Sequence, residues 1–364
     1  MLRKKHHKLV VLSLCDGIAC AFQTFKELGY KENDILYIAS EIDNDAKKIA
    51  KDNHPSIYHL DDMRNVVYKN NQLYFINFDW KIIDKKLEGI KKKLSKKDYQ
   101  KIEERILKNA LLEWAIAPKD KIYNGKIDLV CAGTPCTDVS LAGKKEGIFG
   151  NTKSALFWQF KRIVDEVQPT YWFLENVKMH SKWEDAISEA LNKSPIRLNS
   201  AYWSAQNRER LYWTNITNKI DLKVGNDPTL KDILQYNTDH KWIDTSNKYF
   251  NNEPLFEING CAQRARYWGK NKTRQVIEFR KDQKANCLTT VAKNSYVYID
   301  GRIRDLNVTE RERLQCLPDN YCKAISKSKA VKALGNAWTV EVIKEFFKKI
   351  KYEMEISKST TLVI

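Results

Sequence analysis

Strand-like and helix-like segments alternate along this chain, and the alternation constrains its fold more than any other feature. Residues 9–14 form an apolar run that ends in a turn, and residues 20–28 then carry apolar side chains at helical spacing up to Gly29. A second strand-like run, residues 34–43, precedes a helical pattern that Pro55 ends. The alternation predicts an α/β fold whose sheet is mostly parallel, with helices on both faces.

Two helical patterns over residues 81–117 interrupt the alternation. The first has a stripe of aliphatic side chains, and the second begins at Ser95, with Asp98 in the position that completes a capping box. The alternation resumes near residue 126 and degrades after Trp213. The sequence therefore predicts a large unit over residues 1–216 that carries this insertion, a smaller lobe over 217–320, and a last segment, 321–364, that returns to the large unit.

The charge balance favours a polyanionic partner. The 364 residues include 63 Lys and Arg against 46 Asp and Glu, a formal net charge of +17, which suits binding to nucleic acid. Residues 81–108 alone carry 11 positive and 5 negative charges. These lysines either contact a DNA backbone or form a solvated helical face, and the sequence leaves both alternatives open.

Other classes of protein fit the composition less well. No apolar run approaches the roughly 18 residues of a membrane span, and the first residues lack a signal-peptide cleavage pattern, so we expect an intracellular protein without a membrane anchor. The eight cysteines are scattered, without a Cys-x-x-Cys pair or a zinc-like spacing. We therefore expect no metal, and reduced thiols that are mostly buried, with Cys136 as the exception treated below.

Acidic residues follow three neighbouring strand-like runs. Ligands of open parallel sheets bind beyond the carboxyl ends of the strands, which is where Asp16, Glu41 and Asp62 are expected. Gly17 allows a sharp turn against a ligand, Glu41 can accept hydrogen bonds from two ribose hydroxyls, and Asp62 suits an adenine amino group. These residues predict an adenosine-containing cofactor; the alternative is an ordinary tight turn followed by a solvated glutamate.

A second group surrounds Cys136, which follows Pro135 in a turn after the run 126–133. A thiol attacks only as the thiolate, so a reactive cysteine needs polar or cationic neighbours. Glu175 ends the next strand-like run and is expected at the same sheet edge, while Arg208 and Arg210 alternate on one face of an extended segment. The alternatives are an inert loop cysteine, a helix-capping glutamate and a solvated edge.

These residues belong to motifs that resemble, in order and over nearly the whole chain, those of the DNA cytosine C5 methyltransferases. The motifs are "DGIACAF", "EID", "DDMRNV", "GTPC", "ENV", "QNRER", "RIRDLNVTERERLQCLP" and "KALGNAWTVEVI". "VLSLCDGI", "YIASE" and "DDMRNV" are most similar to the catalytic domains of the mammalian de novo enzymes, whereas the chain length fits a stand-alone bacterial or phage enzyme. The resemblance implies a Rossmann-like, S-adenosylmethionine-dependent catalytic domain over 1–216 and a target-recognition lobe over 217–320.

The resemblance also implies the ligands and the roles of residues. The cofactor is S-adenosylmethionine, and the partner is double-stranded DNA, bound by a monomer that is cytoplasmic if bacterial or phage-encoded. Cys136 matches the nucleophile that adds to C6 of a flipped cytosine, Glu175 the acid that holds N3, and Arg208 and Arg210 the arginines near the base. The residues that match the cofactor motifs are Asp16, Gly17, Ile18, Ala19, Cys20, Glu41, Ile42, Asp62, Met63, Arg64, Asn336, Ala337 and Trp338. The products are 5-methylcytosine and S-adenosylhomocysteine.

Candidates for DNA contact lie in the loop after Cys136 and in the smaller lobe. They are Ser140, Lys144, Arg264, Arg266 and Lys270, with Tyr267 and Trp268 beside them. The same fold also carries tRNA cytosine methyltransferases. A catalytically silent DNA-binding relative is a second alternative, although intact Cys136, Glu175 and Arg208 argue against it. Whether the protein works alone or in a restriction system depends on neighbouring genes.

Five residues depart from the family pattern. Cys15 and Asp16 stand where an aromatic residue usually precedes the first motif glycines, and Ala19 and Cys20 replace glycines. Trp338 follows Asn336 and Ala337 where many bacterial members have a small hydroxyl residue. We therefore expect no aromatic stacking on adenine from residue 15 and a modest cofactor affinity.

Overall fold

A computed structural model describes residues 2, 7–139, 147–149, 152–222, 227–236, 242–246, 248–267 and 272–361. Its centre is a seven-stranded sheet with the order β3-β2-β1-β7-β8-β10-β9. The first five strands in this order run parallel, and β10 is antiparallel to both β8 and β9. The strands are β1 (Leu9–Leu14), β2 (Ile35–Ser40), β3 (Tyr58–Leu60), β7 (Leu129–Gly133), β8 (Tyr171–Val177), β9 (Ile196–Asn199) and β10 (Glu209–Thr214).

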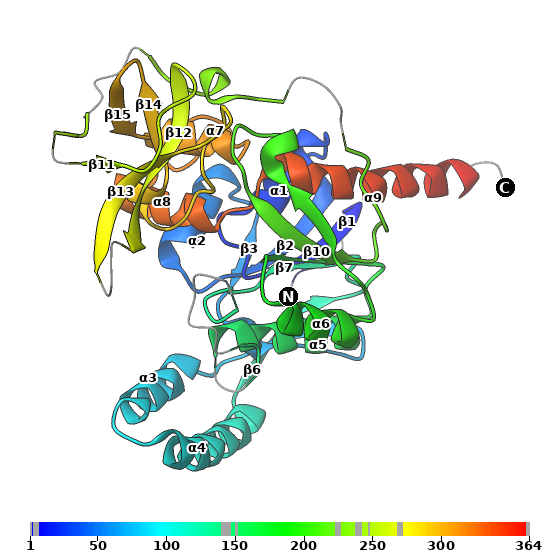
Figure 1. Cartoon of the computed structure of the whole chain (residues 1–364). Helices are drawn as coiled ribbons and strands as arrows, with labels where there is room; N and C mark the ends of the chain where they lie inside the picture. Colours follow the sequence, from blue (N-terminus) through cyan, green and yellow to red (C-terminus); the bar gives the residue numbers. More distant parts are fainter. Residues whose placement is uncertain are drawn as a thin grey trace.

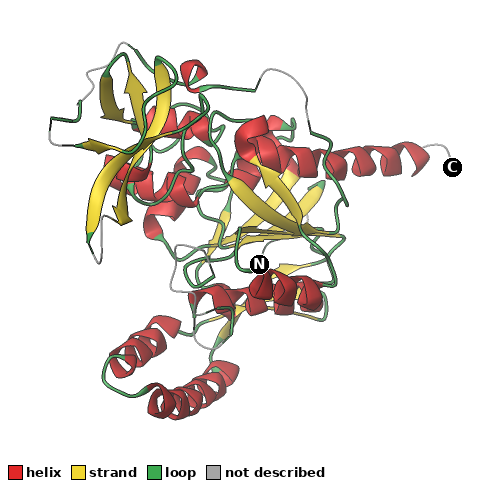
Figure 2. Cartoon of the chain, viewed as in Figure 1, coloured by secondary structure: helices red, strands yellow, loops and turns green. Residues whose placement is uncertain are grey.

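Helices cover both faces of this sheet, because alternate residues of its central strands are buried on opposite sides. Leu9 and Val11 of β1 pack in one buried cluster with α1 (Cys20–Glu27) and α9 (Val340–Thr361). Val10 and Leu12 pack in another with α5 (Leu156–Val167) and α6 (Ser181–Leu191). Figures 1 and 2 show these two helical layers on either side of the sheet. The predicted α/β class, mostly parallel with two covered faces, is confirmed.

The insertion consists of two helices, as predicted, on a small sheet that the sequence analysis missed. Strands β4 (Val66–Lys69), β5 (Gln72–Ile76) and β6 (Lys119–Asn124) form an antiparallel sheet, and α3 (Trp80–Lys91) and α4 (Lys96–Ile116) connect β5 to β6. Ser95 accepts a hydrogen bond from the backbone N–H of Asp98 at 3.3 Å and so caps α4. In Figure 1 this helical hairpin projects away from the central sheet.

A separate five-stranded sheet lies within residues 249–305. Its order is β11-β13-β12-β14-β15, with β11 (Tyr249–Phe250), β12 (Ile258–Tyr267), β13 (Thr273–Phe279), β14 (Tyr296–Ile299) and β15 (Arg302–Asp305). Two helices follow it, α7 (Val308–Leu314) and α8 (Lys327–Asn336), and the fully buried Arg304–Glu310 ion pair of 2.7 Å joins β15 to α7. The division at residues 216 and 320 stays a prediction.

In the described part of the chain, the remaining elements are one α-helix and six single 3-10 turns. These are α2 (Asn44–Asn53), η1 (Glu32–Asp34), η2 (Met63–Asn65), η3 (Lys153–Ala155), η4 (Ser200–Tyr202), η5 (Leu230–Asp232) and η6 (Ala292–Asn294). All eight cysteines are free thiols. Within the described ranges, no helix has the length and apolar character needed to cross a membrane, and no cluster of His, Cys, Asp and Glu side chains could hold a metal ion.

Candidate active site

Parallel pairing of β7 with β8 brings Cys136 and Glu175 to one edge of the central sheet. Gly133, the last residue of β7, lies opposite Glu175 of β8, and Cys136 follows three residues beyond this pair. The Asn176 amide donates to Thr134 Oγ1 at 3.1 Å, which fixes the turn against β8. The shared edge expected from the sequence is therefore present.

The Glu175 carboxylate is held by two donors. Arg210 Nε lies 2.9 Å from Oε1, and the indole Nε1 of Trp338 donates to Oε2 at 3.1 Å. Glu175 is only 8% exposed, and His180 rather than Glu175 caps α6. The helix-capping alternative is therefore wrong, and the carboxylate faces a cationic partner inside the site.

The two arginines of "QNRER" have different partners. Arg208 is buried, and its guanidinium donates to the carbonyl oxygens of Leu288 at 3.0 Å, Gly335 at 3.2 Å and Ala337 at 2.8 Å. Arg210 instead pairs with Glu175. The solvated-edge alternative is wrong for both arginines. The Arg208 guanidinium binds backbone carbonyl oxygens far away in the sequence, and the Arg210 guanidinium binds the Glu175 carboxylate.

A second thiol, Cys287, lies against both guanidiniums. Its Sγ is 3.4 Å from Arg208 Nη1 and 3.7 Å from Arg210 Nη2. Burial raises the pKa of Cys287, but the charges of Arg208 and Arg210 outweigh it and bring the pKa below its usual value. For Cys136, burial and then the Glu175 charge raise the pKa despite the same two arginines. The Cys136 thiol is therefore protonated more firmly than a free cysteine in this state.

The turn after β1 has an unusual backbone that Glu41 supports. Cys15, Gly17 and Ala19 have φ values of 51°, 63° and 62°, in the left-handed region that favours glycine. The Glu41 carboxylate accepts hydrogen bonds from the backbone N–H of Gly17 at 2.8 Å and of Asp43 at 2.7 Å. These two hydrogen bonds count against the solvated-glutamate alternative, and burial raises the pKa of Glu41.

Asp16 in the same turn has an unused acceptor. Its Oδ1 accepts from the Tyr37 hydroxyl at 2.6 Å, while Oδ2 is buried without a hydrogen-bond partner among the described residues. Burial raises the pKa of Asp16 to about 6. A buried carboxylate oxygen without a donor is costly, so the turn suits a ligand that carries an N–H or ammonium group.

The other cofactor candidates gather at the same side. Ile18 and Cys20 share a buried cluster with Ala337, which follows Asn336 at the end of α8, and Trp338 packs against that cluster. Asp62 and Met63 follow β3, and Arg64 pairs with Asp62 at 2.6 Å. Ile42, half exposed, follows Glu41. Cys15 touches Met63, with the two sulfur atoms 3.4 Å apart.

The DNA candidates are more scattered. Arg264 and Arg266 lie on β12 and are partly exposed, and both pair with Glu278 of β13. Tyr267, which follows them, is 86% exposed. Ser140, Lys144, Trp268 and Lys270 lie outside the described residues.

One sequence comparison decides the family. The sequence model of the C-5 cytosine-specific DNA methylases matches residues 80–352, about three quarters of the chain. The chain belongs to this family. The match spans Cys136, Glu175, both arginines and Trp338, whereas the turn after β1, Glu41 and Asp62 lie before the matched region.

Individual methylases agree with this assignment. The chain is 25% identical to the type II methyltransferase M.HhaI of Haemophilus parahaemolyticus over 240 residues, 59% of this chain and 73% of the relative. It is 28% identical to M.HpaII of Haemophilus parainfluenzae over 261 residues, 62% of this chain and 72% of the relative.

Solved structures show the same fold. The methyltransferase EhMeth of Entamoeba histolytica aligns with a TM-score of 0.57 at 11% identity, covering 95% of this chain and 98% of that one. The Dnmt2 methyltransferase of S. pombe aligns with a TM-score of 0.53 at 13% identity, covering 94% and 98%. At these identities the likeness concerns the fold alone.

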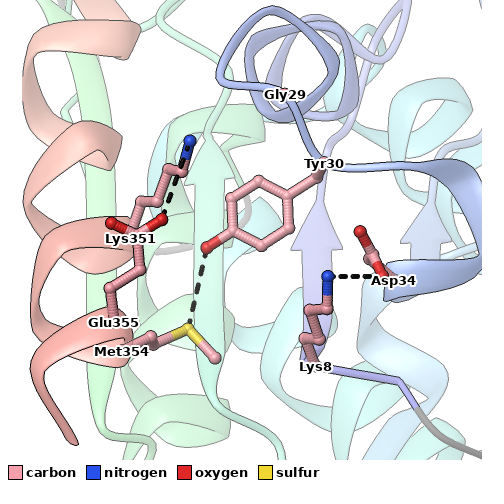
Figure 3. A pocket seen from close by; sticks show the side chains of 7 residues that line it. All are labelled: Lys8, Gly29, Tyr30, Asp34, Lys351, Met354 and Glu355. Atoms are coloured by element: carbon pink, nitrogen blue, oxygen red, sulfur yellow. Dashed lines mark hydrogen bonds and ion pairs between the residues drawn. The ribbon is translucent and has the colours of Figure 1, made fainter. Parts of the chain in front are cut away.

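A surface cavity of about 210 Å³ lies away from the methylase site (Figure 3). Lys8 and Asp34, at its rim, precede β1 and β2, so the cavity lies at the amino ends of these strands, opposite the edge that carries Glu41. Lys8 pairs with Asp34 at 2.9 Å and Lys351 with Glu355 at 3.8 Å. The cavity does not suit the cofactor proposed for a methylase, because its charged side chains pair with one another and it lies at the amino ends of the strands.

Sequence reasoning missed two neighbours of the methylase site. Trp338 matched a cofactor motif, yet its indole contacts Glu175, and Cys287 was one of several scattered thiols. One sign of a special role for Trp338 was present in the sequence, because many bacterial methylases have a small hydroxyl residue at this position. Nothing in the sequence singles out Cys287, because its proximity to the arginines arises from residues about 80 positions apart.

The Trp338–Glu175 contact depends on the absence of a side chain at Gly133. A Cβ there would lie 2.7 Å from Trp338 Nε1, and the indole is packed edge-on against Phe173. We expect Gly133→Ala to displace the indole, to lower the free energy of unfolding by about 1–3 kcal/mol, as overpacking does, and to reduce methylation. Denaturant unfolding and a methyl-transfer assay measure both effects. In a Trp338→Ser background, Gly133→Ala should lower the free energy of unfolding by less, because the indole is gone. An equal decrease in both backgrounds would contradict the proposed clash.

The opposite pKa shifts of the two site thiols give a chemical test. A raised pKa means that the Cys136 thiolate forms only at higher pH, whereas the lowered pKa of Cys287 makes its thiolate available earlier. We expect iodoacetamide labelling, mapped by peptide mass spectrometry, to reach half its maximal rate at a lower pH for Cys287 than for Cys136. In denaturant the two profiles should coincide. The reverse order in the native protein would refute the charge assignment.

Proposed function

We propose that this methylase transfers a methyl group from S-adenosylmethionine to C5 of a flipped cytosine in double-stranded DNA, through a covalent bond between Cys136 and C6. The observation that carries the proposal is the convergence of Cys136, Glu175 and Arg210 at the carboxyl edge of the parallel sheet. A thiol, a carboxyl group and a guanidinium are the groups needed to attack, protonate and hold a pyrimidine.

Each site residue has a distinct task in this reaction. The Cys136 thiol gives its proton to water and its sulfur bonds to C6, while Glu175 shares a proton with N3, so electron density moves onto C5. Arg210, which already pairs with Glu175, binds the adjacent carbonyl oxygen of the base. S-adenosylmethionine, when bound, supplies the methyl group. Loss of the C5 proton to water and cleavage of the bond between C6 and the Cys136 sulfur then give 5-methylcytosine, with S-adenosylhomocysteine as the other product.

The raised pKa of Cys136 fits a site that is completed by its substrate. In the free protein the Glu175 charge opposes thiolate formation. When Glu175 shares a proton with N3, that opposing charge is weakened while Arg208 and Arg210 remain. Thiolate formation is thereby coupled to occupation of the site by cytosine.

The proposed cofactor residues fit an adenosylated amino acid. Glu41 holds the turn at Gly17 and supplies carboxylate oxygens for the ribose hydroxyls, and the unpartnered Asp16 Oδ2 can accept from the cofactor's ammonium group. Asp62, which follows β3, is the proposed acceptor for the adenine amino group. Ile18, Ala19, Cys20, Ile42, Met63, Arg64 and Asn336 to Trp338 complete the proposed set.

The proposed DNA contacts are Arg264 and Arg266, with Ser140, Lys144 and Lys270 as further candidates, and the net charge of +17 supports a polyanionic substrate. A monomeric state and a location inside the cell stay predictions. A labelled-methyl assay with duplex DNA and tRNA as separate substrates distinguishes DNA methylation from the tRNA alternative. Incorporation into tRNA alone would overturn the proposed substrate.

The covalent step predicts the behaviour of Cys136→Ser. Serine is close in size but far less readily ionised, so turnover should be abolished while the fold and cofactor binding persist. A duplex with 5-fluorocytosine at the target should form a denaturant-resistant adduct with the natural protein, because fluorine is not lost as the C5 proton is. An adduct with the serine variant, or methylation at a comparable rate, would assign the attack to another residue.

The cofactor placement predicts the effect of Glu41→Ala. The variant should bind S-adenosylmethionine more weakly by about 1.5–3 kcal/mol, the scale of hydrogen bonds to a charged group. Calorimetry on the purified protein measures this loss, and Glu41→Gln, which keeps one acceptor oxygen, should lose less. Unchanged affinity in the alanine variant would show that the cofactor does not use this strand end.

A further inference from the structure

Arg64 is held between two carboxylates that belong to different parts of the fold. One edge of its guanidinium contacts Asp62, with Nη2 at 2.6 Å and Nε at 3.1 Å from Oδ2. The other edge contacts Asp84 of α3, with Nη1 at 3.0 Å from Oδ1 and Nη2 at 2.8 Å from Oδ2. Both edges of the planar fork are therefore used, which leaves the side chain a single orientation.

The insertion also holds the face of this guanidinium. Arg64 lies over the Trp80 ring of α3, with its Cζ 4.9 Å from the ring centroid, a cation–π contact. Asp84 and Trp80 thus restrain Arg64 on two sides, and both belong to the insertion. On the third side Arg64 meets Asp62, the acid after β3.

The next residue along the chain ties both insertion helices to the same point. Asn65 is buried, and its Oδ1 accepts from the indole N–H groups of Trp80 at 2.9 Å and Trp114 of α4 at 3.2 Å. Its amide donates to the Phe78 carbonyl oxygen at 2.7 Å. The segment that follows β3 therefore contacts both helices of the insertion.

We propose that Asp84 is a positioning residue for the cofactor: through Arg64 the insertion fixes the Asp62 carboxylate, and thereby sets the affinity for S-adenosylmethionine. The inference rests on the proposed function, in which Asp62 receives the adenine amino group. Without Asp84, Arg64 has one free edge and more accessible rotamers. Binding must then also immobilise Arg64 and Asp62, and this entropy cost weakens the complex.

Asp84 itself does little for the packing of the hairpin. Its side chain is 41% exposed, whereas the buried residues of α3 are Trp80 and Leu87. A partly exposed ion pair contributes little to stability. An effect of Asp84 on cofactor affinity would therefore arise at Asp62 rather than from loss of the fold.

The test compares two variants that remove one negative charge from the same helix. Asp84→Asn should raise the Kd for S-adenosylmethionine, measured by calorimetry, by about three- to tenfold, the scale of one coupled contact. Its KM for the cofactor should rise with kcat nearly unchanged, and its melting temperature without cofactor should not move. Glu88→Gln, one helical turn further on and exposed, should bind like the natural protein, and Asp84→Glu should recover part of the affinity.

A double variant tests the route through Asp62. In an Asp62→Asn background, Asp84→Asn should cause no further loss of affinity, because the residue it positions has already lost its charge. An equal loss in both backgrounds, or Asp84→Asn binding like Glu88→Gln, overturns the inference. Failure of the natural protein to bind S-adenosylmethionine would instead overturn the proposed function. A third outcome separates the two: the natural protein binds S-adenosylmethionine, Glu41→Ala weakens this binding, and Asp84→Asn does not. That outcome would overturn this inference and leave the proposed function in place.

Discussion

The buried guanidinium of Arg208 is the interaction on which the rest of the site depends. It contacts carbonyl oxygens of Leu288, Gly335 and Ala337, and so joins the residue before β10 of the central sheet to the segment between β13 and β14 and to the end of α8. Carbonyl oxygens at a helix end lack intrahelical partners, so a buried cation there both satisfies them and is satisfied by them. Lysine could not span these acceptors, because it lacks the planar fork.

The segments that Arg208 joins are closely packed against one another. A Cβ at Gly335 would lie 2.3 Å from the backbone of Thr289, so the end of α8 and the segment 288–289 approach as closely as backbone allows. This approach brings Trp338 over Gly133 and onto Glu175, and Cys287 onto the two arginines. The acidic site is thus assembled from five stretches of chain, and the buried Arg208 cation joins three of them, residues 208–210, 287–289 and 335–338.

The departures from the family pattern have structural counterparts in the cofactor turn. Ala19 occupies a left-handed conformation at φ 62°, where a glycine would be less strained, and Cys15 packs against Met63 through sulfur instead of presenting an aromatic ring. The hydrogen bond from the backbone N–H of Gly17 to the Glu41 carboxylate supports this turn. The insertion adds a second support at the next strand end, through Arg64 and Asn65.

The sequence by itself determined the strand–helix order, the two insertion helices and the residues at the strand ends, including Cys136 and Glu175. Periodicity and turn residues encode which segments are buried and where a strand stops, and parallel pairing places such ends at one edge. It did not predict the antiparallel β10 or the small sheet beside the insertion, whose short strands have only brief alternation. Only the tertiary structure decided that Arg208 clamps Ala337, 129 positions away, and that Trp338 donates to Glu175 across 163 positions. Such pairings depend on how packed layers approach one another, and no local pattern of residues records that geometry.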